Sequence, residues 1–367
     1  MANHGKLDRL KLTNYKSIKA LDLELGNLNI LLGQNGAGKS NFISFFKLMN
    51  KLLNKDLQHY VAEQGVERIL HFGRKASQEL GIHLYFSPNG YSAILTPTTD
   101  DRLIFKQEYT EFFENQIGYE DGHKRKMLAA PGAVESSLPE PEKVQVTIES
   151  HISGYINDWT VYHFHDTSEA AQLKSPCEIN DNERLRPQAE NLAAFLYSIK
   201  DTDAYQRILR NVQRVAPFVQ NFILQPDKLN PQRIRLRWKH QGSDAYFDAH
   251  SLSDGTLRFI CLATLLLQPK LPTILLLDEP ELGLHPYAIQ LLAGLMKSAS
   301  RKTQVIASTQ SVTLTNEFGW QEIIVVQHKD NASVFQHLSE DEVKPWLDAY
   351  AMGEIWQKNL IGGTPSC

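Results

Sequence analysis

The fold of this chain is decided by the stretch Leu28-Asn-Ile-Leu-Leu-Gly-Gln-Asn-Gly-Ala-Gly-Lys-Ser40. Its first half is apolar, and its second half has the spacing Gly33-x-x-x-x-Gly38-Lys39-Ser40 of a phosphate-binding P-loop. Glycines let the backbone wrap closely around a polyphosphate, because they adopt φ angles that other residues avoid. Successive N–H groups and the N-terminus of the following helix then face the anion. We therefore expect a strand, a loop and a helix that bind a nucleoside triphosphate.

Two side chains of this loop have the chemistry for the terminal phosphates. Lys39 has the length to reach the β- and γ-phosphates, and the Ser40 hydroxyl is a predicted ligand of Mg²⁺. A chance glycine-rich turn is the alternative, which the flanking strand and helix patterns disfavour. A dinucleotide loop is excluded, because Asn41 stands where its third glycine belongs. The predicted ATP-binding residues are Gly33, Gln34, Asn35, Gly36, Ala37, Gly38, Lys39, Ser40 and Asn41.

A second apolar segment ends in two carboxylates, in the sequence Thr273-Ile-Leu-Leu-Leu-Asp278-Glu279-Pro280. In P-loop hydrolases such a strand (Walker B) lies in the same sheet as the P-loop strand, and its first carboxylate holds Mg²⁺. Asp278 is therefore a predicted metal ligand together with Ser40. Glu279 is the predicted general base that polarises the attacking water. A strand that merely ends in a solvated acidic turn is the alternative, and the presence of both motifs disfavours it.

A third motif, Leu252-Ser253-Asp254-Gly255-Thr256, precedes the Walker B strand by about twenty residues. It resembles the signature motif of ABC-class ATPases, and more narrowly that of the RecF/SMC group and the stand-alone OLD-like ATPases. Glu281-Leu-Gly-Leu-His285-Pro286 resembles the D-loop of that group, and Asn14-Tyr-Lys-Ser17 resembles a turn near its N-terminus. The stretch from Gly353 to Gly363 resembles the tail of its stand-alone members. A simple helix cap is the alternative for the signature-like residues taken alone.

The resemblance implies a head-to-tail homodimer with two ATP molecules held between P-loop and signature motif. In that arrangement Ser253, Asp254, Gly255 and Thr256 of one subunit would face the γ-phosphate bound by the other. Asp254 departs from the family pattern, which has a glycine at this position.

A second departure concerns Gln310, which stands where the family usually has a histidine that senses the γ-phosphate. Glutamine donates a neutral hydrogen bond but carries no charge. We therefore predict that Gln310 is a catalytic residue and that ATP turnover is slow. The resemblance does not place the Q-loop glutamine of the family, for which Gln78, Gln107 and Gln116 are the candidates.

The predicted fold class is α/β: an ABC-type P-loop NTPase head with an antiparallel β subdomain and an inserted β-rich and helical middle region. We expect residues 1–75 and 250–367 to form the two parts of the ATPase core, with residues 76–249 inserted between them. Within the insertion the pattern predicts strands at Lys143–Ile152 and Arg233–Trp238 and an exposed loop at Met127–Glu142.

Two helices are also predicted in the middle region. Apolar residues recur at helical spacing from Leu192 and again from Tyr205, and Asp201-Thr-Asp203 supplies N-cap residues for the second helix.

Bulk properties indicate an ordinary globular protein, with 42% hydrophobic and 22% charged residues, a net charge of −4 and three cysteines. The cysteines are too few for a disulfide framework, and no apolar run is long enough to span a membrane. We expect a cytoplasmic protein that does not bind membranes. A local basic groove for nucleic acid stays open at this net charge.

Function hypotheses follow from the resemblance. The first is an ATPase that dimerises on ATP and couples this to DNA or to a separately encoded effector nuclease, in DNA maintenance and repair or in anti-phage defence. The second is a regulatory scaffold that holds ATP with little hydrolysis. A built-in Toprim nuclease is disfavoured, because only about fifty-six residues follow Ser311. A transporter subunit is disfavoured by the long separation of P-loop and signature motif. Assemblies larger than a dimer stay open.

Three further features could be functional, but each is also explained by ordinary solvent-exposed side chains. His163 and His165 lie on one face of a predicted strand, which is the geometry of a metal site, but exposed strand histidines are more common. Lys124-Arg-Lys126 is interpreted as a solvated loop rather than a phosphate contact. Arg207, Arg210 and Arg214 follow one side of a helix and either contact DNA or a partner, or form a solvated face.

Overall fold

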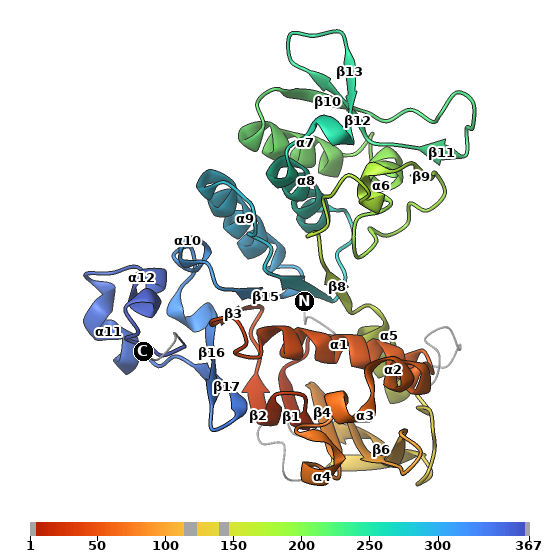
Figure 1. Cartoon of the computed structure of the whole chain (residues 1–367), viewed down its shortest axis with the longest axis vertical. Coiled ribbons are helices and arrows are strands. Elements are labelled where there is room, and N and C mark those ends of the chain that lie inside the picture. Colours follow the sequence, from red (N-terminus) through yellow and green to blue (C-terminus); the bar gives the residue numbers. More distant parts are fainter. Residues whose placement is uncertain (1–4, 114–122, 139–146, 364–367) are drawn as a thin grey trace.

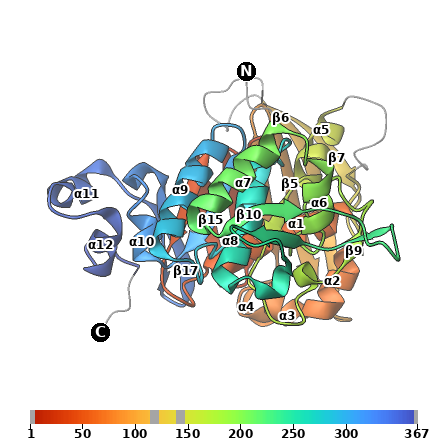
Figure 2. The ribbon, with the colours of Figure 1, turned by 90° about the horizontal axis from the view of Figure 1, so that it is seen from above.

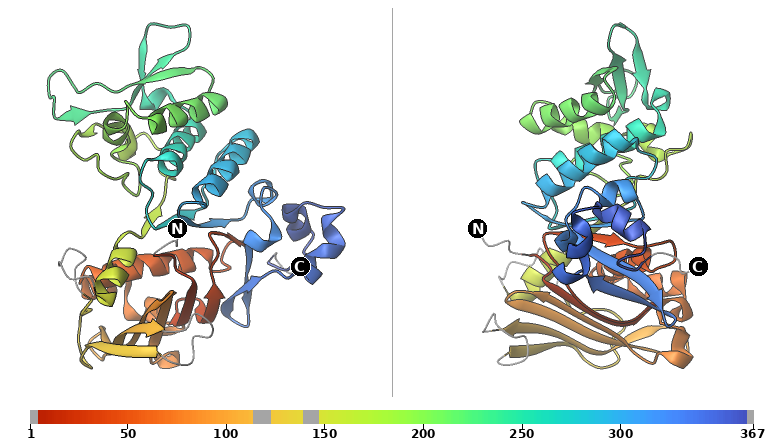
Figure 3. Two further views of the ribbon diagram at one scale, coloured as in Figure 1. Left: turned by 180° about the vertical axis from the view of Figure 1, so that it is seen from behind. Right: turned by 90° about the vertical axis from the view of Figure 1, so that its left-hand side faces the viewer.

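The computed structural model describes residues 5–113, 123–138 and 147–363 (Figure 1). An antiparallel sheet lies at the bottom of Figure 1, a mixed sheet in the middle, and a lobe of helices and short strands at the top. Figure 3 shows the same sequence of layers from behind and from the side. Within these described ranges no helix combines the length and the apolar character that a membrane-spanning segment needs.

The mixed sheet contains the strands predicted to carry the nucleotide motifs. Its order is β17 (Ala332–His337), β16 (Ile323–Lys329), β3 (Leu28–Leu32), β15 (Gln304–Thr309), β14 (Ile274–Asp278) and β8 (Thr160–Tyr162). All neighbours are parallel except β16 and β17. Because parallel strands are covered on both faces, they have continuous apolar sequences, and β3 and β15 are buried at every position.

Alternate residues of the mixed sheet pack into two different cores. Ile30 of β3 packs on the side of α8 (Asp254–Leu267) and α9 (Pro286–Ala299), whereas Leu31 packs on the side of α1 (Lys39–Leu53). This alternation follows from the two-residue period of a strand. The P-loop helix α1 and the signature helix α8 therefore pack on opposite faces of the mixed sheet.

The antiparallel sheet covers the other side of α1. Its order is β2 (Ile18–Glu24), β1 (Arg9–Tyr15), β4 (Leu80–Phe86), β5 (Asn89–Pro97), β6 (Leu103–Phe113) and β7 (His123–Ala129). Strands β4 to β7 come from the middle of the chain and continue a sheet that begins near the N-terminus. Strand β8, from the same region, joins the mixed sheet. The middle of the chain thus contributes to both sheets, and the three-part division of the chain stays a prediction.

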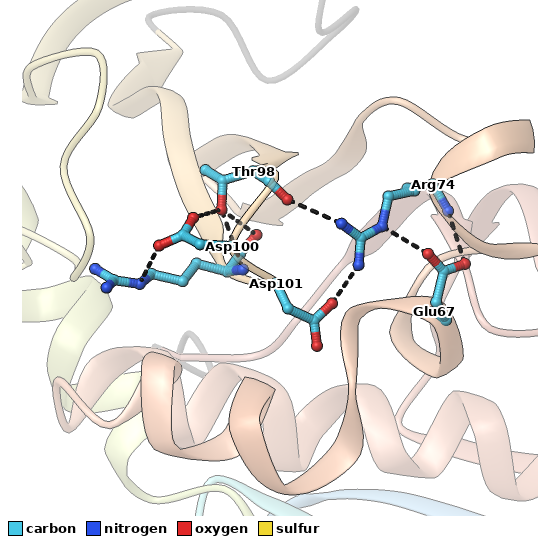
Figure 4. Close-up of polar contacts among 6 residues, drawn as sticks. Glu67, Arg74, Thr98, Asp100 and Asp101 are labelled. Carbon is cyan, nitrogen blue, oxygen red and sulfur yellow. Dashed lines mark hydrogen bonds and ion pairs between the residues drawn. The ribbon is translucent and has the colours of Figure 1, made fainter.

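Three short helices connect α1 to this sheet: α2 (Leu57–Gln64), α3 (Val66–Ile69) and α4 (Gly73–Ala76). Arg74 of α4 joins α3 and α4 to the β5–β6 turn (Figure 4). Its guanidinium contacts the Glu67 carboxylate at 2.6 Å, donates to the Thr98 carbonyl at 3.1 Å and pairs with Asp101. Because these groups are partly exposed, the cluster orients the turn more than it stabilises the fold.

The top lobe contains the two helices predicted in the middle region, as α6 (Leu192–Ser198) and α7 (Asp203–Val215). Thr202 caps α7 by accepting the Tyr205 N–H at 3.4 Å. Two small sheets complete the lobe: β9 (Cys177–Glu178) with β11 (Arg233–Ile234), and β10 (Val219–Ile223) with β12 (Arg237–His240) and β13 (Tyr246–Asp248). The strand predicted over Arg233–Trp238 is therefore divided between two sheets.

The strand predicted over Lys143–Ile152 is wrong where the structure describes it, because helix α5 (Ile148–Asn157) occupies the segment. Thr147 and Ser150 form a capping box that starts this helix, and Ile152 and Ile156 bury one face. Residues 143–146 lie outside the described residues.

The exposed loop predicted over Met127–Glu142 is partly wrong. Strand β7 extends to Ala129, and Ser136 and Leu138 are buried. Residues 139–142 lie outside the described residues. The basic run 124–126 is also in β7 rather than in a loop, where Arg125 pairs with Glu111 at 2.7 Å and Lys126 with Glu149 at 3.0 Å.

At the other side of the molecule the chain ends in α10 (Val312–Thr315), α11 (Glu340–Leu347) and α12 (Met352–Gln357). Figure 2 shows these helices at the side opposite α5. Gly353 packs so closely on α10 that a Cβ there would lie 2.3 Å from the Val312 carbonyl oxygen. Glycine at this position therefore lets α12 contact the segment that follows β15.

Gln304 at the start of β15 joins the two sheets, so its loss should destabilise the whole chain. Its buried amide bonds the Leu7 N–H at 3.1 Å, the Leu7 carbonyl at 2.9 Å and the Gly26 carbonyl at 2.8 Å. We expect Gln304→Ala to lower the free energy of unfolding by about 2–4 kcal/mol, because these buried groups lose their partners. Denaturant titration measures this. Gln321→Ala, at an exposed position, is the control and should stay within about 0.5 kcal/mol.

Candidate nucleotide-binding site

The P-loop connects β3 to α1 and is packed too tightly for side chains at its key glycines. A Cβ at Gly33 would lie 2.2 Å from the Val326 carbonyl oxygen, and one at Gly38 would lie 2.0 Å from Ser333 Oγ. Gly38 also has φ 113°, a conformation that disfavours residues with a side chain. A Cβ at Gly36 would contact nothing within 4 Å. The loop is therefore closed at its back, toward the β16–β17 hairpin, and open at Gly36.

The N-terminus of α1 leaves its backbone donors available to an anion. Its N-cap is Gly38, so no side chain accepts from the first N–H groups, which also have no acceptor within the helix. Residues 34–36, 38–41 and Glu279 line the hollow in front of this terminus. These donors, together with the positive end of the helix, fit the phosphates of ATP.

Lys39 lies across this loop. Its Nζ donates to the carbonyls of Gly33 at 2.6 Å and Gln34 at 3.0 Å. Burial lowers the pKa of Lys39, and the negative field of Glu279 and Asp278 opposes that shift. An ammonium held by two carbonyls and surrounded by carboxylates is well placed to exchange those carbonyls for phosphate oxygens.

Two segments distant in sequence hold the loop from behind. Ser17, in the turn between β1 and β2, accepts from Asn41 Nδ2 at 2.7 Å and bonds Ser333 Oγ at 2.6 Å. The Gly363 carbonyl accepts from the Gln34 N–H at 3.2 Å. The N-terminal turn and the closing tail, which sequence analysis noted only as resemblances, thus support the P-loop directly.

Asp278 is the last residue of β14 and Glu279 follows it; β15 lies between β14 and the P-loop strand β3. Asp278 accepts a hydrogen bond from the Ser308 hydroxyl of β15. Glu279 has a left-handed backbone, with φ 45°, and its N–H bonds the Ser308 carbonyl at 3.1 Å and Ser308 Oγ at 3.2 Å. Such strained backbones gather at functional sites. The turn directs Glu279 into the hollow of the P-loop.

The residues that could hold Mg²⁺ fit a hard cation in chemistry. Ser40 offers a hydroxyl oxygen beside the P-loop, and Asp278 offers a carboxylate at the same edge of the sheet. The roles assigned to these two residues, to Glu279 and to the P-loop stay predictions.

Gln310 directly follows β15, which lies between the P-loop strand and the Walker B strand. The neighbouring Thr309 donates to the buried carboxyl of Glu281 and accepts from the Ser311 N–H at 2.9 Å. Gln310 therefore lies at the edge of the sheet where the nucleotide motifs end. Its catalytic role stays a prediction.

Sequence analysis named Glu281 only as part of a motif, although it is 7% exposed and one of its oxygens has no partner among the described residues. Burial raises the pKa of Glu281 to about 7. A short polar turn just after a Walker B strand gives no sequence signal of such burial.

The signature-like residues begin α8. Ser253 is the N-cap, and its Oγ accepts the Thr256 N–H at 3.3 Å and bonds Thr256 Oγ1 at 2.8 Å. Asp254 and Gly255 form the first turn of the helix. None of these residues lines the hollow of the P-loop, so the structure does not bring them to the ATP site of their own chain. Their action on the ATP of a partner subunit stays a prediction.

His163 and His165 follow β8 rather than lying within it. Among the described residues, no three His, Cys, Asp or Glu side chains come together in a group that could hold a metal. His165 instead bonds the Asp278 carbonyl oxygen through Nε2 at 2.7 Å. Burial lowers the pKa of His163 to about 4, so this imidazole is neutral. The two histidines lie beside the Walker B strand, a position that the sequence analysis did not predict.

The Q-loop glutamine is not located. Gln78 and Gln107 are exposed and do not line the hollow, and Gln116 lies outside the described residues.

Comparison with known proteins places this site in a family. Residues 28–316 match the family described as "AAA domain, putative AbiEii toxin, Type IV TA system". The chain belongs to this family. No curated protein sequence matches it.

Two solved structures share its fold. An SMC head bound to the C-terminal winged-helix domain of ScpA has a TM-score of 0.59 at 15% identity, over 92% of this chain and 99% of that one. An SMC head with an extended coiled coil, bound to the C-terminal domain of ScpA from Pyrococcus furiosus, has a TM-score of 0.54 at 15% identity, over 93% and 98%. The predicted ABC/SMC-like P-loop fold is confirmed.

The buried carboxyl of Glu281 should make stability depend on pH. Because its pKa is higher in the folded state, the folded chain binds the proton more tightly, and its stability falls as pH rises from about 5 to 8. Over that range wild type should lose about 2–3 kcal/mol more than Glu281→Gln, which does not titrate. Chemical denaturation of both proteins at pH 5 and pH 8 measures the difference. Equal pH dependence would show that Glu281 is ionised when folded.

Proposed function

We propose that this chain is an ATPase that forms a closed dimer when it binds ATP and hydrolyses ATP slowly. The change between the closed and the open dimer would be transmitted to a partner. Membership of a P-loop ATPase family supports ATP binding. The observation that supports the proposal is that Glu279 lines the same hollow as the P-loop residues. A general base at that position would lie beside the phosphates of a bound ATP.

Within this proposal each group has one task. The N–H groups of the P-loop and Lys39 bind the β- and γ-phosphates. Ser40 and Asp278 hold Mg²⁺, which would neutralise charge on the phosphate oxygens. Glu279 accepts a proton from water as the water oxygen attacks the γ-phosphorus, and the bond from that phosphorus to the β–γ bridging oxygen breaks. The products are ADP and inorganic phosphate.

Dimerisation is proposed because the signature helix lies outside the hollow of its own chain. Ser253 and Gly255 start a fourteen-residue helix, whose N-terminus is suited to an anion supplied by another subunit. Leu282 and Tyr287, on the segment that follows Glu279, are 45% and 43% exposed. Apolar side chains at this place fit burial against a second copy. Gln310, which carries no charge, supports slow turnover.

The alternative is a regulatory scaffold that holds ATP with little hydrolysis. Gln310 is the observation that favours it, because a neutral amide stabilises developing phosphate charge less than a histidinium does. The two proposals differ in whether nucleotide changes the assembly.

A nucleic acid is the partner that charge favours. Residues 200–240 contain nine Lys and Arg against three Asp and Glu, in a chain of net charge −4. Arg207, Arg210 and Arg214 lie on the exposed face of α7, and none forms an ion pair with a described residue. A row of unpaired guanidinium groups fits a phosphate backbone.

A separately encoded effector, such as a nuclease, is the other partner that we propose. Both SMC heads that resemble this chain were solved with a bound domain of another protein. The family description names a toxin and a TA system. These descriptions favour a role in defence over one in DNA repair.

Glu279→Gln should trap the closed dimer, because it removes the general base and leaves the phosphate contacts intact. With Mg-ATP its mass by light scattering should rise to about twice 41.7 kDa, whereas without nucleotide it should stay at the monomer value. Lys39→Ala, which loses phosphate binding, should stay monomeric in both conditions. A mass that never responds to ATP would favour the scaffold.

Changing Arg207, Arg210 and Arg214 to Glu should weaken the binding of duplex DNA. Each lost phosphate contact should lower the slope of log affinity against log salt by about 0.9. Fluorescence anisotropy at several salt concentrations measures both quantities. Lys19, Lys55 and Lys75 changed to Glu, all exposed, form a control matched in charge. Equal losses in the two variants would mean that net charge, and not the α7 face, governs binding.

A further inference from the structure

Arg258, in the second turn of the signature helix α8, makes contacts that the proposed function has not used. Its guanidinium donates from Nη2 to the His165 carbonyl at 2.8 Å and from Nη1 to the Leu282 carbonyl at 2.7 Å. It forms no ion pair with any described residue. Arginine therefore uses its charge here on two backbone carbonyls that belong to different parts of the fold.

Both carbonyls belong to segments that contact the Walker B residues Asp278 and Glu279. Leu282 lies three residues after Glu279, and its carbonyl belongs to the turn that Glu279 begins. His165 reaches the same place from the other direction, because its Nε2 bonds the Asp278 carbonyl oxygen at 2.7 Å. A carbonyl only accepts, so Nε2 carries the proton. Arg258, His165 and the end of β14 thus form one hydrogen-bonded chain.

A small cavity lies beside the hydrogen bonds that join Arg258, His165 and the end of β14. It is lined by groups from three elements, which include His165 after β8, Arg258 of α8, and Asp278 and Glu279 at the end of β14. Figure 1 shows β8 below α8, at the base of the top lobe. The cavity lies beside the Walker B carboxylates, whereas the P-loop hollow contacts Glu279 separately.

Two glycines let α8 approach the turn closely. A Cβ at Gly255 would lie 2.6 Å from the Gly283 carbonyl oxygen, and one at Gly283 would lie 2.5 Å from Arg258 Nη1. The turn after Glu279 is therefore held between the first turn of α8 and the Arg258 guanidinium. Any displacement of the helix start moves the turn as well, because no space separates them.

We propose that Arg258 is a positioning residue that couples the signature helix to the turn carrying Glu279. The proposal rests on the proposed function, in which Ser253 and Gly255 meet the ATP of the partner while Glu279 acts on the ATP of its own chain. Closure on one ATP would then set the general base at the other. Hydrolysis at the two sites becomes cooperative through this contact.

The geometry requires a guanidinium and not merely a positive charge. Arginine presents two donors in a fixed plane, so one side chain reaches both carbonyls at once. Lysine presents a compact ammonium on a flexible stem and should hold the two carbonyls poorly. Alanine leaves both without the donor. The conservative variant and the truncation therefore differ in a way that general loss of packing does not produce.

The test measures ATP binding, dimer formation and the rate of hydrolysis as a function of ATP concentration. We expect wild type to give a sigmoidal rate curve. Arg258→Ala should bind ATP within about twofold of wild type but give a hyperbolic curve and a kcat lowered roughly tenfold or more. Arg258→Lys should be nearly as impaired. Added methylguanidinium should restore rate and sigmoidicity to Arg258→Ala only. Arg301→Ala, at an exposed position, is the control and should match wild type.

The outcomes separate this inference from the proposed function. If wild type dimerises on ATP and Arg258→Ala keeps its rate and sigmoidal curve, the coupling is wrong and the ATPase stands. A fully active Arg258→Lys would equally overturn the requirement for a guanidinium, and it decides the matter should Arg258→Ala fail to fold. If wild type neither dimerises nor hydrolyses ATP, the proposed function fails first, which light scattering of wild type alone reveals.

Discussion

The hydrogen bonds of strand β15 hold both the fold and the candidate site together. At its start, Gln304 joins the mixed sheet to the N-terminal sheet through Leu7 and Gly26. At its end, Ser308 bonds Asp278 and the backbone of Glu279, and Thr309 bonds Glu281. The strand is buried throughout, so the side chains of Gln304, Ser308 and Thr309 depend on these partners for their hydrogen bonds. A change in the position of β15 would therefore move every acidic group of the site.

The site concentrates acid around one lysine. The negative charges of Asp278, Glu279 and Glu281 all act on Lys39, whose ammonium donates to the Gly33 and Gln34 carbonyls of the P-loop. Adding the phosphates of ATP to this surrounding places further negative charge beside three carboxyl groups. A cation and a proton are the two ways to relieve that repulsion. Mg²⁺ on Asp278 would supply the first, and the raised pKa of Glu281 supplies the second.

Local motifs were predictable from sequence, and contacts between distant segments were not. The P-loop and the Walker B strand have fixed spacing and apolar runs, so their strands and the helix α1 followed directly. The ABC-type fold class followed from the family resemblance of the signature-like motif at residues 252–256. The helix α5 was missed because its capping box, Thr147 with Ser150, is weaker in sequence than the alternation before it. The position of His165 beside Asp278 depends on β8 pairing with β14, which are more than a hundred residues apart. No local pattern specifies such a pairing. The burial of Glu281 was unpredictable for the same reason, because it depends on a contact with Thr309 of a distant strand.

The glycines of the site show how closely its parts are matched. Gly33 and Gly38 allow the P-loop to lie against the β16–β17 hairpin, and Gly255 and Gly283 allow α8 to lie against the turn after Glu279. Each contact would be lost by the addition of one methyl group. Because interiors this dense do not deform gradually, we expect the P-loop to move together with the β16–β17 hairpin, and α8 to move together with the turn after Glu279. Glu279 has a left-handed backbone and lines both the P-loop hollow and the cavity beside α8, so a displacement on either side changes its surroundings.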